Sequence, residues 1–161
     1  MGIFRRLLWI ACLAALCSCT QTAKTIPPSQ WKRVESPGFT LYVPPGFTEI
    51  ATQGTDSVVR RFNGEGIALS LDYGWYSDPL NYSDHPGFVE NTETINGWRA
   101  RMVSFDGPAT PASSDRVVAV HFSDTGRDRV TLTVYVTCQS DTACDLARRI
   151  FRTVDFAERR P

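Results

Sequence analysis

Residues 130–156 read VTLTVYVTCQSDTACDLARRIFRTVDF, and two hydrophobic periods meet inside this stretch. Over residues 130–138, apolar side chains alternate with threonine and tyrosine, which predicts a strand with one buried and one wetter face. Further along, apolar residues recur at i, i+4, i+7 and i+11, the spacing of a stripe along a helix: Ala143, Ala147, Ile150 and Val154. Asp141 or Thr142 can cap this helix by accepting free backbone N–H groups. The stretch therefore predicts a strand followed by a helix.

Shorter strand-like runs separated by turn residues precede this stretch. They cover residues 31–35, 39–43, 58–62, 67–73, 92–95, 98–105 and 116–122. Several consecutive runs are joined by short turns, such as the two-residue hairpin signal Asn96-Gly97, so neighbours along the chain should pair antiparallel. We therefore predict an α+β fold, a mostly antiparallel β-sheet with a C-terminal helix packed on one face. It should form a single domain over residues 31–157.

The first nineteen residues, MGIFRRLLWIACLAALCSC, have the organisation of an export signal. Arg5 and Arg6 precede an apolar run of ten residues, 7–16. Since a membrane-spanning helix needs ~20 apolar residues, this run fits the hydrophobic region of a signal peptide instead. A buried helix of a soluble domain is the alternative, but such a helix should show a polar stripe. We expect residues 1–18 to be a signal peptide.

Leu16-Cys17-Ser18-Cys19 resembles the lipobox of bacterial lipoproteins, although Cys17 departs from the usual residue at its position. The resemblance implies a diacylglyceryl group on the Cys19 thiol and cleavage before that residue. It makes residues 19–30 a lipidated N-terminus and tether, and the membrane the partner of Cys19. Thr20 at the second mature position favours the outer membrane, facing the periplasm, in a Gram-negative cell. Secretion without a lipid and an uncleaved anchor stay open as alternatives.

The cysteine count leaves two thiols in the folded part. Of five cysteines, Cys12 and Cys17 would leave with the signal peptide and Cys19 would take the lipid. Cys138 and Cys144 remain, and two thiols in an oxidising compartment are expected to pair. We predict a structural disulfide between them that pins the helix to the sheet. Two free buried thiols or a metal pair are the alternatives, although the spacing is not that of a zinc site.

Two segments resemble the PsbP-like group, named for a photosystem accessory protein. They are GFTLYVPPGFTEI at residues 38–50 and DLARRIFRTVDF at residues 145–156. The resemblance extends loosely over residues 31–156 and implies a non-enzymatic binding or assembly role. The group usually has a helix after the early hairpin, and the sequence offers no clear place for it between Gly46 and Asp56.

Charge and residue types argue against several classes of function. The chain has 17 basic and 17 acidic residues, and losing Arg5 and Arg6 leaves 15 against 17. Such a balance predicts neither a nucleic-acid surface nor a polybasic membrane patch. We expect no catalytic residues, no cofactor and no metal. His85 reads as a turn residue and His121 as part of a polar sheet face, and a catalytic role for either is the weaker interpretation.

An aromatic stretch after residue 73 is the main candidate for recognition. Trp75, Tyr76 and Tyr82 lie on a predicted long loop, and such side chains are enriched in binding surfaces. The alternative is a loop that folds back and buries its own rings. The functional hypotheses are, in order, an envelope lipoprotein that binds a protein or assists assembly, a small-ligand or carbohydrate binder, and a lipid-anchored hydrolase.

Overall fold

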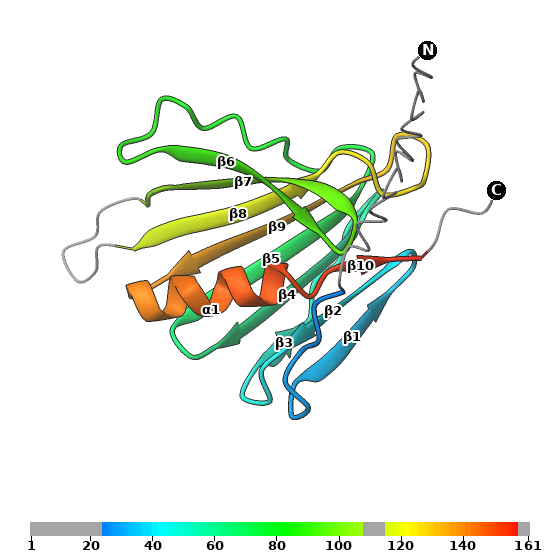
Figure 1. Cartoon of the computed structure of the whole chain (residues 1–161), viewed down its shortest axis with the longest axis horizontal. Coiled ribbons are helices and arrows are strands. Elements are labelled where there is room, and N and C mark those ends of the chain that lie inside the picture. The colour runs from blue at the N-terminus through cyan, green and yellow to red at the C-terminus, as the bar shows by residue number, and fades with distance from the viewer. Residues whose placement is uncertain (1–23, 108–114, 158–161) are drawn as a thin grey trace, which may run out of the picture.

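The computed structural model of the chain describes residues 24–107 and 115–157 (Figure 1). Within these ranges the elements, in chain order, are β1 (Lys32–Ser36), β2 (Phe39–Val43), β3 (Thr48–Ile50), β4 (Val58–Gly64), β5 (Ile67–Gly74), β6 (Val89–Ile95), β7 (Trp98–Asp106), β8 (Arg116–Phe122), β9 (Thr131–Cys138), α1 (Asp141–Phe151) and β10 (Asp155–Phe156). Strands dominate and the single described helix comes near the C-terminus, so the α+β prediction is confirmed.

The strands form two antiparallel sheets. The large sheet has the order β3-β4-β5-β9-β8-β7-β6, and the small sheet has the order β1-β2-β10. Neighbouring strands in the large sheet are also consecutive along the chain, except for the β5–β9 pair, because β9 inserts between β5 and β8. Helix α1 and the small sheet lie on one side of the large sheet (Figure 1). We call that side the inner face and the opposite side the outer face.

The main core lies between the inner face and α1. The alternation predicted for β9 is present, since Leu132, Val134, Val136 and Cys138 are buried toward the helix. The helix contributes Ala143, Cys144, Ala147, Ile150 and Phe151 to the same core. Burying a side chain of valine or leucine size contributes ~1.5–3 kcal/mol, so this seam stabilises the contact between helix and sheet strongly.

The helix ends differ slightly from the expectation. Its N-cap is Ser140, whose hydroxyl accepts a hydrogen bond from the Ala143 backbone N–H at 3.2 Å. The predicted caps Asp141 and Thr142 are wrong by one or two positions, because the helix itself begins at Asp141. Val154 lies beyond the last helical residue and is nevertheless buried, so it extends the apolar stripe into the turn before β10.

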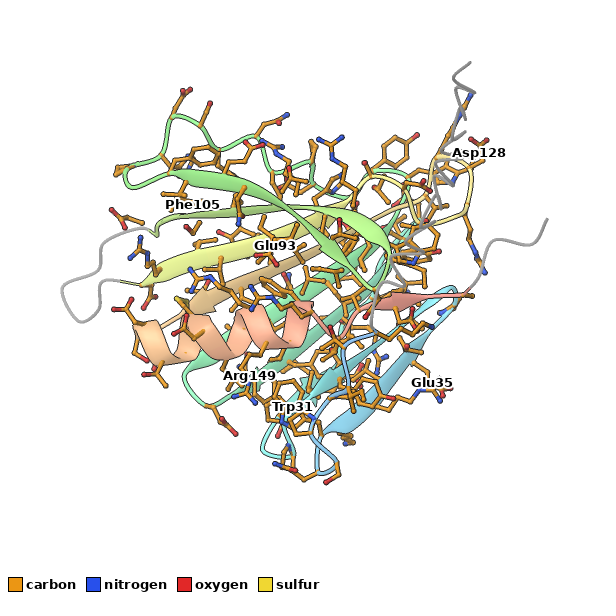
Figure 2. The ribbon with its side chains drawn as sticks, viewed as in Figure 1. Trp31, Glu35, Glu93, Phe105, Asp128 and Arg149 are labelled. Atoms are coloured by element: carbon orange, nitrogen blue, oxygen red, sulfur yellow. A yellow bond between two sulfur atoms is a disulfide. The ribbon has the colours of Figure 1, made fainter. Side chains whose placement is uncertain are left out.

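The first described residues lie against the domain. The Lys24 ammonium is 2.9 Å from a carboxylate oxygen of Asp155, and the Thr25 N–H donates to the Asn96 side-chain oxygen at 2.7 Å. Further along, the guanidinium of Arg149 lies over the Trp31 ring (Figure 2). The predicted signal peptide and Cys19 fall outside the described residues. Within those residues, no helix has the length and hydrophobicity needed to cross a bilayer.

Candidate functional site

Residues 75–88, which we call the aromatic segment, connect β5 to β6 and cover part of the outer face. Leu80 of this segment is buried against residues of β7 and β8, including Val103, Phe105 and Val117. Tyr82 and Phe88 pack on the same cluster, and Phe105 lies on this side of the sheet in Figure 2. The large sheet therefore has a second, smaller hydrophobic core on its outer face.

Asp78 organises the turn at the centre of the aromatic segment. Its carboxylate accepts from the Leu80 N–H at 2.7 Å and from the Tyr82 hydroxyl, and its backbone oxygen accepts from the Thr133 hydroxyl at 2.6 Å. The bond to Asp78, followed by burial, raises the pKa of Tyr82 to about 12. Tyr82 is therefore a neutral hydrogen-bond donor that holds the segment in place.

His121 lies beneath the aromatic segment on the outer face, in a closed polar cluster with Ser77 and Thr133. All three side chains are buried, and His121 Nδ1 is 2.9 Å from Thr133 Oγ1. Because the Thr133 hydroxyl donates to a backbone oxygen of the segment, Thr133 Oγ1 is left to accept from Nδ1–H of His121. Burial, and then the charge of Arg101, lower the pKa of His121. A neutral, structural histidine results.

His85 has a different environment. It is exposed near the end of the aromatic segment, and its ring packs edge-on against Tyr82 and at a tilt against Phe105, with centroids 5.1 and 4.8 Å away. A hydrolase would require one of the two histidines in an accessible pocket beside a carboxylate and a nucleophile. His85 instead supports the packing of the segment, and the hydroxyls near His121 are buried together with it.

The structure separates the three aromatic residues that were considered as a recognition surface. Trp75 and Tyr76 are 63% and 77% exposed, whereas Tyr82 is partly buried on the second core. Residues 77–88 thus fold back onto the sheet, and only the first two residues of the segment project into solvent as large aromatic groups. The candidate site is consequently the adjacent pair Trp75–Tyr76, at the point where β5 ends.

Cys138 and Cys144 are joined in a disulfide, with their Cα atoms 5.4 Å apart. Both residues are almost fully buried, and the bond links the end of β9 to the first turn of α1. Because neither sulfur is accessible to a partner thiol, the position suits a structural bond better than a catalytic one.

A polar pocket that sequence reasoning missed borders this disulfide. Its volume is about 420 Å³, and its lining includes Asp106, Asp115, Arg116 and Asp141. These residues lie at the end of β7, at or just before the start of β8, and at the start of α1, so no local motif could have indicated the pocket. No group of three or more metal-ligating side chains converges anywhere in residues 24–107 and 115–157. Within the described residues, the Glu90 carboxylate is paired with the Arg101 guanidinium at 2.8 Å.

Comparisons with known proteins identify the fold. No family model and no curated protein matches this chain. Among solved structures, the chain is similar to the solution structure of cyanobacterial PsbP (CyanoP) from Synechocystis sp. PCC 6803, with a TM-score of 0.56 and 11% identity. The match covers 86% of this chain and 99% of that one. The domain therefore has a PsbP-like fold, as the two sequence segments suggested. In place of a helix after the early hairpin it has β3.

Proposed function

We propose that this protein is an exported bacterial lipoprotein with a lipid on Cys19 and a domain that binds a partner or assists assembly without chemistry. In a Gram-negative cell, Thr20 at the second mature position would direct it to the outer membrane, where the domain faces the periplasm. The proposal joins an N-terminal processing signal to a folded domain whose exposed features are those of recognition.

The observation that carries the non-enzymatic part is the contrast between buried polar groups and exposed aromatic ones. The side chains with potential for chemistry hold the aromatic segment in place: the Asp78 carboxylate fixes its turn, and His121 bonds to Thr133, whose hydroxyl donates to the Asp78 backbone oxygen. Trp75 and Tyr76, by contrast, are left in solvent, although large aromatic side chains gain free energy from burial. Exposed aromatic groups of this kind are typical of interaction sites.

Two further features support the proposal. The Cys138–Cys144 disulfide suits an oxidising compartment outside the cytoplasm. The PsbP-like fold is the fold of the group whose resemblance implies an accessory role. A small-ligand or carbohydrate site built from Trp75, Tyr76 and Tyr82 is less well supported, because Tyr82 packs on the second core while the other two are exposed.

Lipidation is tested by the intact mass of the membrane-extracted protein. The wild-type chain should lack residues 1–18 and carry the mass of a diacylglyceryl group, with or without a further acyl chain. Cys19→Ala should abolish this mass and release the protein from membranes. Cys17→Ala is the matched control, because it removes a neighbouring thiol and restores a common lipobox residue. A Cys19→Ala chain that matures and fractionates with membranes as before would contradict the proposal.

The non-enzymatic part is tested by complementation of a deletion strain. If the domain works without chemistry, His121→Gln and His85→Gln proteins at wild-type levels should restore whatever envelope defect the deletion causes. Loss of complementation by a folded, normally abundant histidine variant would contradict the proposal and favour the hydrolase hypothesis.

A further inference from the structure

Large exposed hydrophobic side chains are unevenly distributed over the described surface. They are Ile26, Ile50, Trp75, Tyr76 and Val89. Ile26, at 90%, is the most exposed of the five, and it follows directly on Thr25, which is bonded to Asn96. Its position relative to Trp75 and Tyr76 decides whether the three side chains could form one contact surface.

The strand registers place Trp75 and the turn of Asn96 at the same end of the large sheet. Gly74, the last residue of β5, pairs with Thr131, the first residue of β9. Phe122, the last residue of β8, lies one position from that level. Strand β7 extends past it, because Arg101 pairs with His121 and three further residues of β7 precede Arg101. The β6–β7 turn therefore projects from the sheet end at which β5 finishes.

Contacts between the two sheets join this end to the start of the described chain. Lys24 pairs with Asp155 in β10, and just after β10 the Ala157 N–H donates to the Gly38 oxygen at 3.2 Å. Gly38 in turn lies directly against the Tyr73 side chain and the guanidinium of Arg127. Tyr73 is two residues before Trp75. We call this end of the domain, with Ile26, Trp75, Tyr76 and the β8–β9 loop, the entry end.

Covalent geometry limits how far the entry end can be from a lipid on Cys19. Lys24 is five residue steps beyond Cys19, and a fully extended chain spans at most ~3.6 Å per step, which gives about 18 Å. A chain held at the bilayer surface through Cys19 therefore holds Lys24, and with it the entry end, close to that surface. The opposite end, with the polar pocket at Asp106 and Asp141, would face away.

We infer that the entry end rests on the membrane, with Trp75 and Tyr76 inserted among the lipid headgroups. This inference depends on the proposed lipid on Cys19, and it names the lipid bilayer as the partner of the Trp75–Tyr76 site. Tryptophan and tyrosine prefer the membrane–water interface, where the ring is partly desolvated and the polar atom stays hydrated. Ile26 adds an apolar side chain at the point where the chain arrives.

Charge indicates which kind of lipid surface is recognised. The exposed β8–β9 loop, whose Asp128 is labelled in Figure 2, carries Asp124, Arg127, Asp128 and Arg129, and these charges cancel. Polybasic recognition of anionic lipid would require an excess of lysine and arginine. The contact should therefore form on zwitterionic bilayers, and salt should affect it little.

Quenching of tryptophan emission by brominated lipids tests the inference on the full mature lipoprotein in phosphatidylcholine vesicles. Trp31, Trp75 and Trp98 are the tryptophans that remain once the signal peptide is removed. The emission lost in the Trp75→Phe variant measures the contribution of Trp75, and this contribution should be strongly quenched at both low and high salt. A matched probe is Val89→Trp in the Trp75→Phe background, because Val89 is exposed but pairs with Ser104, well back from the entry end. That probe should stay unquenched.

The outcomes separate this inference from the proposed function. If intact mass shows the lipid on Cys19 and Trp75 is not quenched, the membrane contact is wrong and the lipoprotein proposal stands. A chain without the lipid overturns both. Equal quenching of the Trp75 and Val89 positions overturns the orientation. Protection of Trp75 from acrylamide in detergent, increasing with protein concentration, would assign the site to a second copy of the chain and overturn the membrane contact.

Discussion

Replacing Leu80 by alanine should detach the aromatic segment from the outer face. Leu80 is fully buried, and its side chain is the part of the segment inserted deepest into the second core, beside Val103 and Phe105. Truncating a buried leucine to alanine costs about 2–5 kcal/mol, and the cost is smaller where the surroundings can collapse into the cavity. A segment covered only by solvent can adjust, so we expect a loss of about 3 kcal/mol in the stability of the closed segment.

The backbone conformation of Leu80 also predicts how glycine and alanine variants at this position differ in stability. Its φ of 63° lies in the left-handed region, which costs a non-glycine residue ~1–2 kcal/mol. Leu80→Gly relieves this strain but adds about 0.5–1 kcal/mol of chain entropy on closing. Leu80→Gly should therefore be as stable as Leu80→Ala or slightly more stable. At Leu69, a buried β5 residue without a positive φ, glycine should be less stable than alanine by about 1 kcal/mol.

Amide hydrogen exchange measures the closed segment directly. The Tyr82 N–H donates to the Leu80 oxygen and the Asp106 N–H donates to the Pro86 oxygen, so both amides report on closure. Their protection should fall in both Leu80 variants, while amides of β9 stay protected, and urea unfolding gives the global stability of each chain. A Leu80→Ala change that leaves both amides protected to within 1 kcal/mol would refute the reasoning, as would a Leu80→Gly chain clearly less stable than Leu80→Ala.

Three further expectations concern other parts of the fold. Burial lowers the pKa of His121 from 6.5, so the unfolded chain takes up this proton at a higher pH than the folded chain does. The stability contributed by neutral His121 is therefore present above about pH 6.5 and is lost as the pH falls through the folded pKa. Urea unfolding at neutral and acidic pH should show this loss in the wild-type chain, and the loss should disappear in His121→Gln. The disulfide closes a short loop, so replacing both Cys138 and Cys144 by alanine should lower the free energy of unfolding by about 2 kcal/mol. Urea unfolding of this variant should match urea unfolding of the wild-type chain in the presence of reductant. Asn96, at φ 49°, donates its side-chain amide to the Val154 oxygen, so Asn96→Ala should lower the melting temperature more than Asn96→Gly, which keeps the backbone relaxed.

The parts of the fold that followed from the sequence are those with one clear hydrophobic period. Strand β9 and helix α1 were predictable because each buries one regular face against the other. Strand β3 was not predicted, because all three of its residues, Thr48–Ile50, are exposed and carry no burial pattern. The predicted start of β6 was three residues late for the same reason, since the first four residues of this edge strand are exposed.

The sequence contains a pattern that indicates the second core, although we predicted that the second face of the sheet would be wetter. Strand β8 reads RVVAVHF, an almost continuous apolar run, and all of its residues after Arg116 are buried. Continuous apolar runs indicate strands covered on both faces, so some other segment had to lie over Val117 and Ala119. No local pattern identifies the covering segment, because that depends on the path of the β5–β6 connection over the folded sheet.

The same covering explains why only part of the aromatic segment is available for recognition. The outer face needs cover over β7, β8 and β9, and Leu80, Tyr82 and Phe88 supply it from the middle and end of the segment. Trp75 and Tyr76 come too early in the segment to reach that core, since they directly follow the last residue of β5, at one end of this interior strand. Their exposure is therefore set by chain geometry rather than by a loose loop. Two large rings fixed in solvent at the entry end are suited to the bilayer contact that we propose.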